Sequence, residues 1–163
     1  MAVENRLLDK ADWYVEDTLA NYLHSYQLQN EELTQDDYRE IRRWAANHIG
    51  FFVTWLIQHD AKEMMTPDEE TSLQSVKDEH TLGVDYLLDW CDGKLGTMDV
   101  KKDFQDFVNN YYEHQYMKDY SEFVVNDLYD LPLEFLGSWE DYHLFAPVID
   151  QAYADYLAGK RFH

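Results

Sequence analysis

The sequence has very little of what builds a turn-rich or disulfide-bonded protein. Six glycines and three prolines occur among 163 residues, and Cys91 is the single cysteine. So few chain-breaking residues argue against a sandwich or barrel of short strands and favour helices. One cysteine excludes an intrachain disulfide and a zinc site made of several thiolates. The length suits one compact domain, so we expect a single helical domain over residues 1–163.

Long apolar runs are also missing. No stretch approaches the 18 consecutive apolar residues of a membrane-spanning helix. The first residues, Met-Ala-Val-Glu-Asn-Arg, lack the apolar segment of a signal peptide. Together with the single cysteine, this predicts a cytoplasmic protein that does not bind membranes. Apolar residues make up 45% and aromatic residues 16% of the chain, which is enough for a folded core.

Positive charge is scarce. Lys and Arg number 13 against 33 Asp and Glu, so the formal net charge is −20. Such a charge repels phosphate, and we therefore expect no direct binding to nucleic acid. The arginines of segment 36–43 alternate with acids at helical spacing, which indicates ion pairs on a helix surface.

The strongest helical pattern covers residues 34–60. Thr34 is a suitable N-cap, and Asp36 and Asp37 would lie in the first turn, where the helix dipole favours negative charge. Apolar residues surround almost the whole circumference between residues 49 and 57, which is typical of a buried helix. Gly50 lies inside this stretch and indicates the close approach of a neighbouring helix or of the large aromatic rings around it. We therefore place this helix at the centre of the fold.

Weaker periodicity and capping signals predict further helices around it. We expect helices over residues 12–26, from Thr66, from Thr81 to Gly93, from Thr97, over residues 118–130, from Ser138 to Phe145, and from Pro147. The helix from Thr66 is only weakly amphipathic, so it should be short or mobile. No segment alternates with a period of two. The predicted fold class is therefore an all-α bundle of six or seven helices around a central apolar helix at residues 34–60.

One segment of the central helix resembles a known family. Residues 45–55 read Ala-Ala-Asn-His-Ile-Gly-Phe-Phe-Val-Thr-Trp, and this resembles the Ala-x-x-His-Ile-Gly-x-Phe-x-x-Trp helix of an uncharacterised bacterial family, a domain of unknown function. Asp12-Trp13-Tyr14, residues 92–95 and the paired tyrosines between residues 107 and 120 look like the same family. The resemblance implies a bacterial protein and transfers no catalytic residue.

His48 is the candidate for a catalytic or metal-binding role. It lies on the apolar side of the central helix, where a histidine is usually bonded to a backbone carbonyl or a carboxylate. As an alternative, His48 could hold a metal ion together with Asp85 and Asp89, two acids four residues apart. The sequence has no His-x-x-x-His or Glu-x-x-His motif, no Gly-rich phosphate loop and no nucleophile elbow. We therefore expect no cofactor and consider an enzyme the less favoured class.

The back half of the chain suggests a binding surface. Between Asp119 and Gly159 there are nine acids, nine aromatic residues and neither Lys nor Arg. Acids beside exposed aromatic rings suit a cationic protein, because the field speeds encounter and the rings anchor the complex. The alternative is a solvated acidic face that only maintains solubility. The predicted partner-binding residues are Asp119, Glu122, Asp127, Asp130, Glu134, Trp139, Glu140 and Asp141.

These patterns lead to three hypotheses about function. The first is an acidic protein-binding module, in concrete form an immunity-type or antitoxin-type protein that occludes a basic bacterial effector such as a nuclease. The second is a metal-dependent enzyme or ligand binder centred on His48 and neighbouring carboxylates. The third is a nucleic-acid mimic whose carboxylates imitate phosphates.

Overall fold

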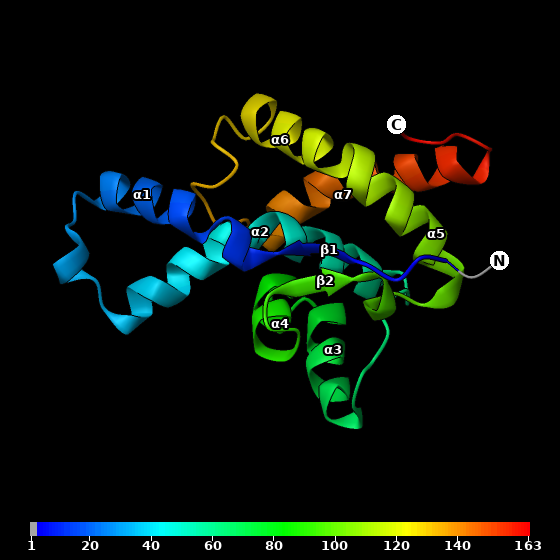
Figure 1. Ribbon diagram of the computed structural model, residues 1–163, viewed down its shortest axis with the longest axis horizontal. Helices are drawn as coiled ribbons and strands as arrows, with labels where there is room; N and C mark the ends of the chain where they lie inside the picture. Colours follow the sequence, from blue (N-terminus) through cyan, green and yellow to red (C-terminus); the bar gives the residue numbers. More distant parts are fainter. Residues whose placement is uncertain (1–2) are drawn as a thin grey trace.

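The computed structural model describes residues 3–163 as a helical bundle around one long helix (Figure 1). The central helix α2 spans Gln35–Gln58 and is buried almost continuously from Trp44 to Ile57. Thr34 caps it as predicted, because its hydroxyl accepts the N–H of Asp37 while the Asp37 carboxylate accepts the N–H of Thr34. The predicted all-α bundle with a central apolar helix is confirmed.

The other helices cover α2 from several sides. In Figure 1, α5, α6 and α7 lie on one side of α2, and α3 and α4 lie on the other. The helices are α1 (Val15–Tyr26), α3 (Glu70–Lys77), α4 (Gly83–Trp90), α5 (Lys102–Tyr111), α6 (Met117–Asn126) and α7 (Trp139–Leu157). Short 3-10 turns at Ala11–Trp13, Asn30–Glu32, Pro67–Glu69 and Thr97–Asp99 connect them. The segment after Thr66 thus forms a short helix, as its weak pattern predicts.

Gly50 allows α2 and α4 to cross at close range. A methyl group at this position would lie 2.6 Å from Val84 Cβ and 2.8 Å from Val84 Cα. Gly83 approaches from the other side, since a Cβ there would lie 2.8 Å from the carbonyl oxygen of Gly50. Of the two expectations for Gly50, the structure therefore shows the close approach of a neighbouring helix, which is α4.

A small two-stranded sheet accompanies the helices, and the sequence patterns did not indicate it. Strand β1 (Leu7–Lys10) pairs antiparallel with β2 (Lys94–Gly96), with Asp9 opposite Leu95 and an irregularity between Leu7 and Asp9. Strands of four and three residues are too short for a recognisable period of two. Their pairing also joins segments far apart in the chain, so local patterns do not indicate it.

Two predicted helix boundaries are wrong. The expected break near residue 147 is missing, because α7 continues through Pro147. Pro147 lies on the exposed face, so the carbonyl of His143 that loses its helical hydrogen bond can face water. A second boundary is also absent. We expected separate helices from Thr97 and over residues 118–130, but a π-helical turn at Tyr112–Tyr116 joins α5 directly to α6 without a break.

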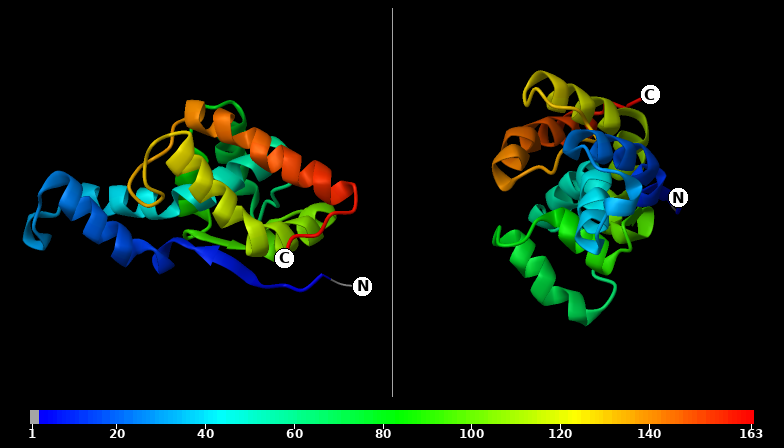
Figure 2. Two further views of the ribbon diagram at one scale, coloured as in Figure 1. Left: turned by 90° about the horizontal axis from the view of Figure 1, so that it is seen from above. Right: turned by 90° about the vertical axis from the view of Figure 1, so that its left-hand side faces the viewer.

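A helical hairpin projects from the body of the molecule. Figures 1 and 2 show α1 and the first half of α2 extending away from the other helices. This hairpin has a small core of its own, formed by Tyr22, Ile41 and Trp44. The loop before α7 contributes Leu136 to that core, so the loop contacts the hairpin where it leaves the body.

Candidate functional site

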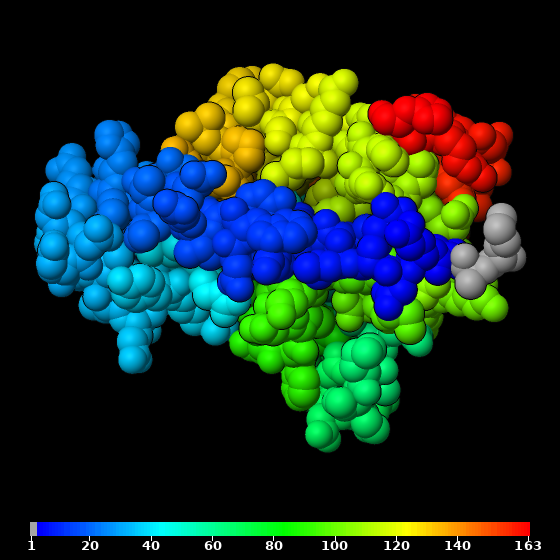
Figure 3. All heavy atoms as spheres, in the orientation of Figure 1, coloured from blue at the N-terminus to red at the C-terminus, as the bar shows by residue number. Residues whose placement is uncertain are grey.

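The predicted acidic segment covers α6, the loop after it and the start of α7. Figure 3 shows its yellow and orange atoms on the surface above the hairpin. None of the seven predicted acids of residues 119–141 forms an ion pair within the described part of the chain. By contrast, Asp85 and Glu40 bind Arg43 on α2. The acidic segment therefore presents negative charge that no basic side chain of residues 3–163 neutralises.

Three of these acids have bonding roles inside the fold. Asp119 accepts hydrogen bonds from Tyr111 (2.7 Å) and Gln115 (2.8 Å). Asp141 caps α7 by accepting the N–H of Ser138 at 3.0 Å. Asp130 accepts the N–H of Leu131 at 2.9 Å. The other four carry no side-chain hydrogen bond within residues 3–163: Glu122, Asp127, Glu134 and Glu140.

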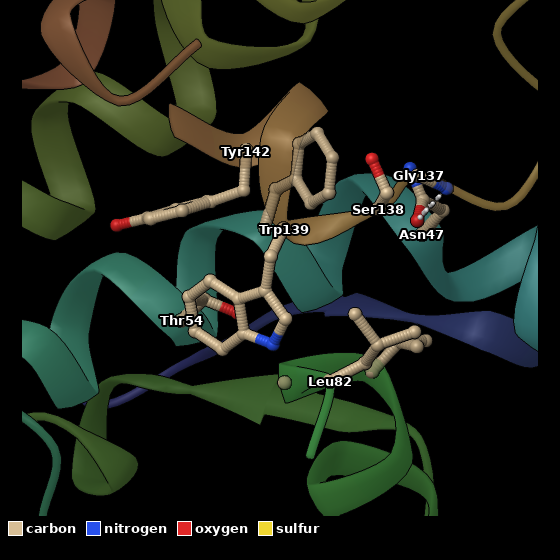
Figure 4. A pocket seen from close by; sticks show the side chains of 10 residues that line it. Asn47, Thr54, Leu82, Gly137, Ser138, Trp139 and Tyr142 are labelled. Atoms are coloured by element: carbon tan, nitrogen blue, oxygen red, sulfur yellow. Dashed lines mark hydrogen bonds between the residues drawn. The ribbon is translucent and has the colours of Figure 1, made fainter. Parts of the chain in front are cut away.

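Trp139 points inward rather than toward a partner. Figure 4 shows its indole between Thr54 of α2 and Leu82 at the start of α4. It lines a cleft with a free volume of about 10 Å³. This is room for roughly one water molecule. The cleft is therefore too small for a substrate, and the half-buried Trp139 ring belongs mainly to the packing of α7.

Tyr129 is the exposed ring of the acidic segment. Of the nine aromatic residues between Asp119 and Gly159, the other eight are buried or half-buried, whereas Tyr129 is 89% exposed. It follows α6 directly and stands next to the acids Asp127 and Asp130 in sequence. Exposed apolar neighbours are Val125 (47%) and Leu131 (52%). Sequence patterns alone did not separate this ring from the eight packed ones.

His48 is completely buried and bonds a carboxylate. Its Nε2 lies 3.0 Å from Oδ2 of Asp9 on β1, and the same oxygen accepts the hydroxyl of Tyr112 at 2.6 Å. The ring of Tyr14 packs edge-on against the imidazole at 4.5 Å. The interpretation of His48 as a core histidine paired with a carboxylate agrees with this geometry. Asp9 was missed, because strand β1 carries no recognisable periodicity.

Asp9 stays ionised in this interior position. Burial by itself would raise the pKa of Asp9, but the hydrogen bond and charge of His48, followed by hydrogen bonds from Tyr112 and Tyr14, lower the pKa below its ordinary value. The same arrangement raises the pKa of the Tyr112 hydroxyl, chiefly through burial and then through the negative charge of Asp9. Tyr112 therefore remains a donor to Asp9 at physiological pH.

The metal site considered for His48, Asp85 and Asp89 is not assembled. Asp85 binds Arg43 through two contacts of 3.0 and 3.2 Å, and Arg39 lies 3.4 Å from Asp85 and 3.5 Å from Asp89. His48 bonds Asp9 instead. Within residues 3–163, no three His, Cys, Asp or Glu side chains gather closely enough to hold a metal ion. Helical spacing brought the two acids to one face, but arginines of α2 occupy that face.

A second buried polar cluster escaped prediction. Lys62 is 5% exposed, and its Nζ lies 3.3 Å from the hydroxyl of Tyr86, which in turn donates to Glu69. Glu69 also accepts the backbone N–H groups of Met65 and Thr66, both at 2.7 Å. The Thr-Pro-Asp-Glu sequence at residues 66–69 could have indicated the capping role of Glu69. No local signal connects Lys62 with Tyr86.

Asn47, beside His48, joins three parts of the fold. Its Nδ2 donates to the hydroxyl of Tyr120 on α6 at 2.7 Å. Its Oδ1 accepts the N–H of Gly137 at 2.9 Å, as the dashed line in Figure 4 shows. The loop that carries the acidic segment into α7 is therefore fixed directly to the central helix.

Comparisons with known proteins place the chain in a family. No described helix is long and apolar enough to cross a membrane. No curated protein and no solved structure matches the chain. A family model for a domain of unknown function, DUF7832, matches residues 7–132, from β1 through the His48 helix to the loop after α6. This match covers well over half of the chain and leaves α7 outside it. The chain therefore belongs to the DUF7832 family, as its resemblance to a domain of unknown function predicted.

Proposed function

We propose that this protein binds a cationic protein through the acidic segment of residues 119–141 and blocks it, in the manner of an immunity or antitoxin protein that occludes a basic bacterial effector. The observation that supports this most is the set of seven acids on that segment without a basic partner among residues 3–163. Unpaired carboxylates on one surface repel one another, and a basic partner relieves this repulsion on binding.

The charge of the whole chain acts in the same direction. A net charge of −20 attracts a basic partner over a distance of about a Debye length and raises the association rate. Such steering weakens steeply as salt is added, because ions screen exposed charges. Binding of the partner should therefore be fast and salt-sensitive.

Affinity capture at low and high salt tests this function. The full chain is immobilised and incubated with extract of the cells that encode it, and retained proteins are identified by mass spectrometry. We expect a basic protein that is lost at high salt and whose own activity falls when the acidic protein is added. Retention of acidic, salt-insensitive proteins alone would contradict the proposal.

Matched charge variants decide whether the acidic segment is responsible. The test variant replaces four acids without side-chain hydrogen bonds, namely Glu122→Gln, Asp127→Asn, Glu134→Gln and Glu140→Gln. The control variant makes the same change in charge on the hairpin, through Glu16→Gln, Asp17→Asn, Glu31→Gln and Asp36→Asn. Each variant has a net charge of −20 + 4 = −16. The test variant should lose the partner and the control should keep it. Equal losses would assign the effect to overall charge rather than to this surface.

A further inference from the structure

Tyr129 is presented to solvent by a rigid turn. Its φ of 55° lies in the left-handed region, which non-glycine residues occupy at a cost of about 1–2 kcal/mol. The turn is held from both sides, because Leu128 N–H donates to the carbonyl of Phe123 (3.3 Å) and Asp130 N–H donates to the carbonyl of Val124 (3.0 Å). Leu128 also packs against the main core. The backbone that carries the exposed ring is thus held in one conformation by hydrogen bonds to α6.

The exposed apolar residues Val125 and Leu131 lie within four residues of Tyr129 in the sequence, one on α6 and one just after the turn, and we name the three residues the Tyr129 patch. Glu122 lies one helical turn before Val125 on the exposed face of α6, and Asp127 and Asp130 flank the ring in sequence. None of these acids has a basic partner among the described residues. The patch therefore combines an apolar contact surface with negative charge around it.

We infer that the Tyr129 patch is the anchor point for an arginine-containing segment of the cationic partner, with a guanidinium group stacked on the Tyr129 ring. This inference rests on the proposed function and names the chemistry by which the acidic segment recognises its partner. Rigid aromatic side chains are typical binding hot spots, because little conformational entropy is lost when they are covered.

Arginine fits this surface better than lysine. Its planar guanidinium stacks on an aromatic face and still donates hydrogen bonds from its edge to carboxylates. The chain itself contains such a contact, since the guanidinium carbon of Arg161 lies 4.0 Å from the centre of the Tyr156 ring. A lysine ammonium is a compact charge with stronger hydration, and it gains less from an exposed ring.

Three equally charged synthetic peptides test the anchor on the full chain. In the first, arginine alternates with leucine; in the second, arginine alternates with serine; in the third, lysine alternates with leucine. Affinities are measured by fluorescence anisotropy at low and high salt. We expect the arginine–leucine peptide to bind most tightly. Tyr129→Ser should weaken that peptide by about 3- to 30-fold, the usual range for cation–π contacts. Tyr129→Phe should retain the affinity, because the aromatic face is kept.

Tyr38→Ser is the matched control. Tyr38 is 51% exposed on α2, outside the Tyr129 patch, so its loss should leave every affinity unchanged. If Tyr129→Ser binds all peptides as the unmodified chain does, with salt dependence preserved, the anchor is refuted while the proposed function stands. If no peptide binds in a salt-dependent way, the proposed function fails and the inference fails with it.

Discussion

The imidazole of His48 and the carboxylate of Asp9 meet inside the protein, with Nε2 and Oδ2 3.0 Å apart and both residues at most 3% exposed. This pair connects the central helix to strand β1 across 39 positions of sequence. With Tyr112 bonded to the same carboxylate, it holds the N-terminal strand against α2 and the π-helical turn.

Acid should weaken the protein through Asp9. Since the pKa of Asp9 is lower in the folded than in the unfolded chain, its contribution to stability is fully present above about pH 4. It is lost as the pH falls through the folded-state pKa. Asp9→Asn should cost about 1–3 kcal/mol at neutral pH. The difference in unfolding free energy between the two proteins, measured in urea, should shrink below pH 4. A constant difference would show that Asp9 titrates equally in both states.

Replacing His48 should affect stability rather than metal content. His48→Ala leaves the buried Asp9 carboxylate without its charged or donating neighbour, and we expect a loss of about 3 kcal/mol or more. Metal analysis should give the same content before and after substitution. Added zinc or magnesium should not raise the melting temperature of the original chain, since a bound ligand would stabilise it. A rise that His48→Ala abolishes would restore the metal-binding alternative.

A side chain at position 50 should destabilise the protein, because the contact between α2 and α4 leaves no room for it. Gly50→Ala gains up to about 1 kcal/mol of helix propensity, but overpacking costs about 1–3 kcal/mol, so we expect net destabilisation. Val84→Ala should not rescue it, because alanine keeps its Cβ, so the added methyl group would still lie 2.6 Å from this Cβ and 2.8 Å from the Cα at position 84. Chemical denaturation of the single and double variants measures this. A more stable Gly50→Ala protein would show that the helices can separate at no cost.

Cys91 should react slowly with alkylating agents. Burial, helped by the carboxylates of Asp99 and Glu69 and opposed by Lys62, raises the pKa of the Cys91 thiol to about 11. Compared with an ordinary thiol, the thiolate fraction near pH 8 is lower by about two orders of magnitude. Iodoacetamide should therefore label the native chain far more slowly than the chain in denaturant. Because there is no other cysteine, the ratio of the two rates reports this site directly.

Asn47 should stabilise the fold as a bridge. Asn47→Ala leaves the Gly137 N–H and the Tyr120 hydroxyl without their partner, and we expect a loss of about 2–4 kcal/mol. Tyr120→Phe removes only one of the two bonds and should cost about 1 kcal/mol. The double variant should lose less stability than the sum of the two single losses, because both substitutions remove the same hydrogen bond between Asn47 and Tyr120. Simple additivity in urea unfolding would contradict the bridge.

The helices of this protein were predictable because their causes are local. The 3.6-residue pattern of segment 34–60, the caps Thr34 and Ser138, and Gly50 within an apolar helix all act over a few residues. The charge imbalance after Asp119 is equally visible in the sequence. By itself the sequence therefore determined the helical class, the central helix and the sign of the charge on the acidic segment.

The tertiary structure decided which side chains meet. The pairing of β1 with β2, of His48 with Asp9 and of Lys62 with Tyr86 joins distant segments, and no local pattern encodes such contacts. α7 also continues through Pro147, which lies on the exposed side of the helix, where a carbonyl without a helical partner can be solvated. Trp139 packs against the core whereas Tyr129 is exposed to solvent, because the burial of a side chain depends on neighbours that the whole fold provides.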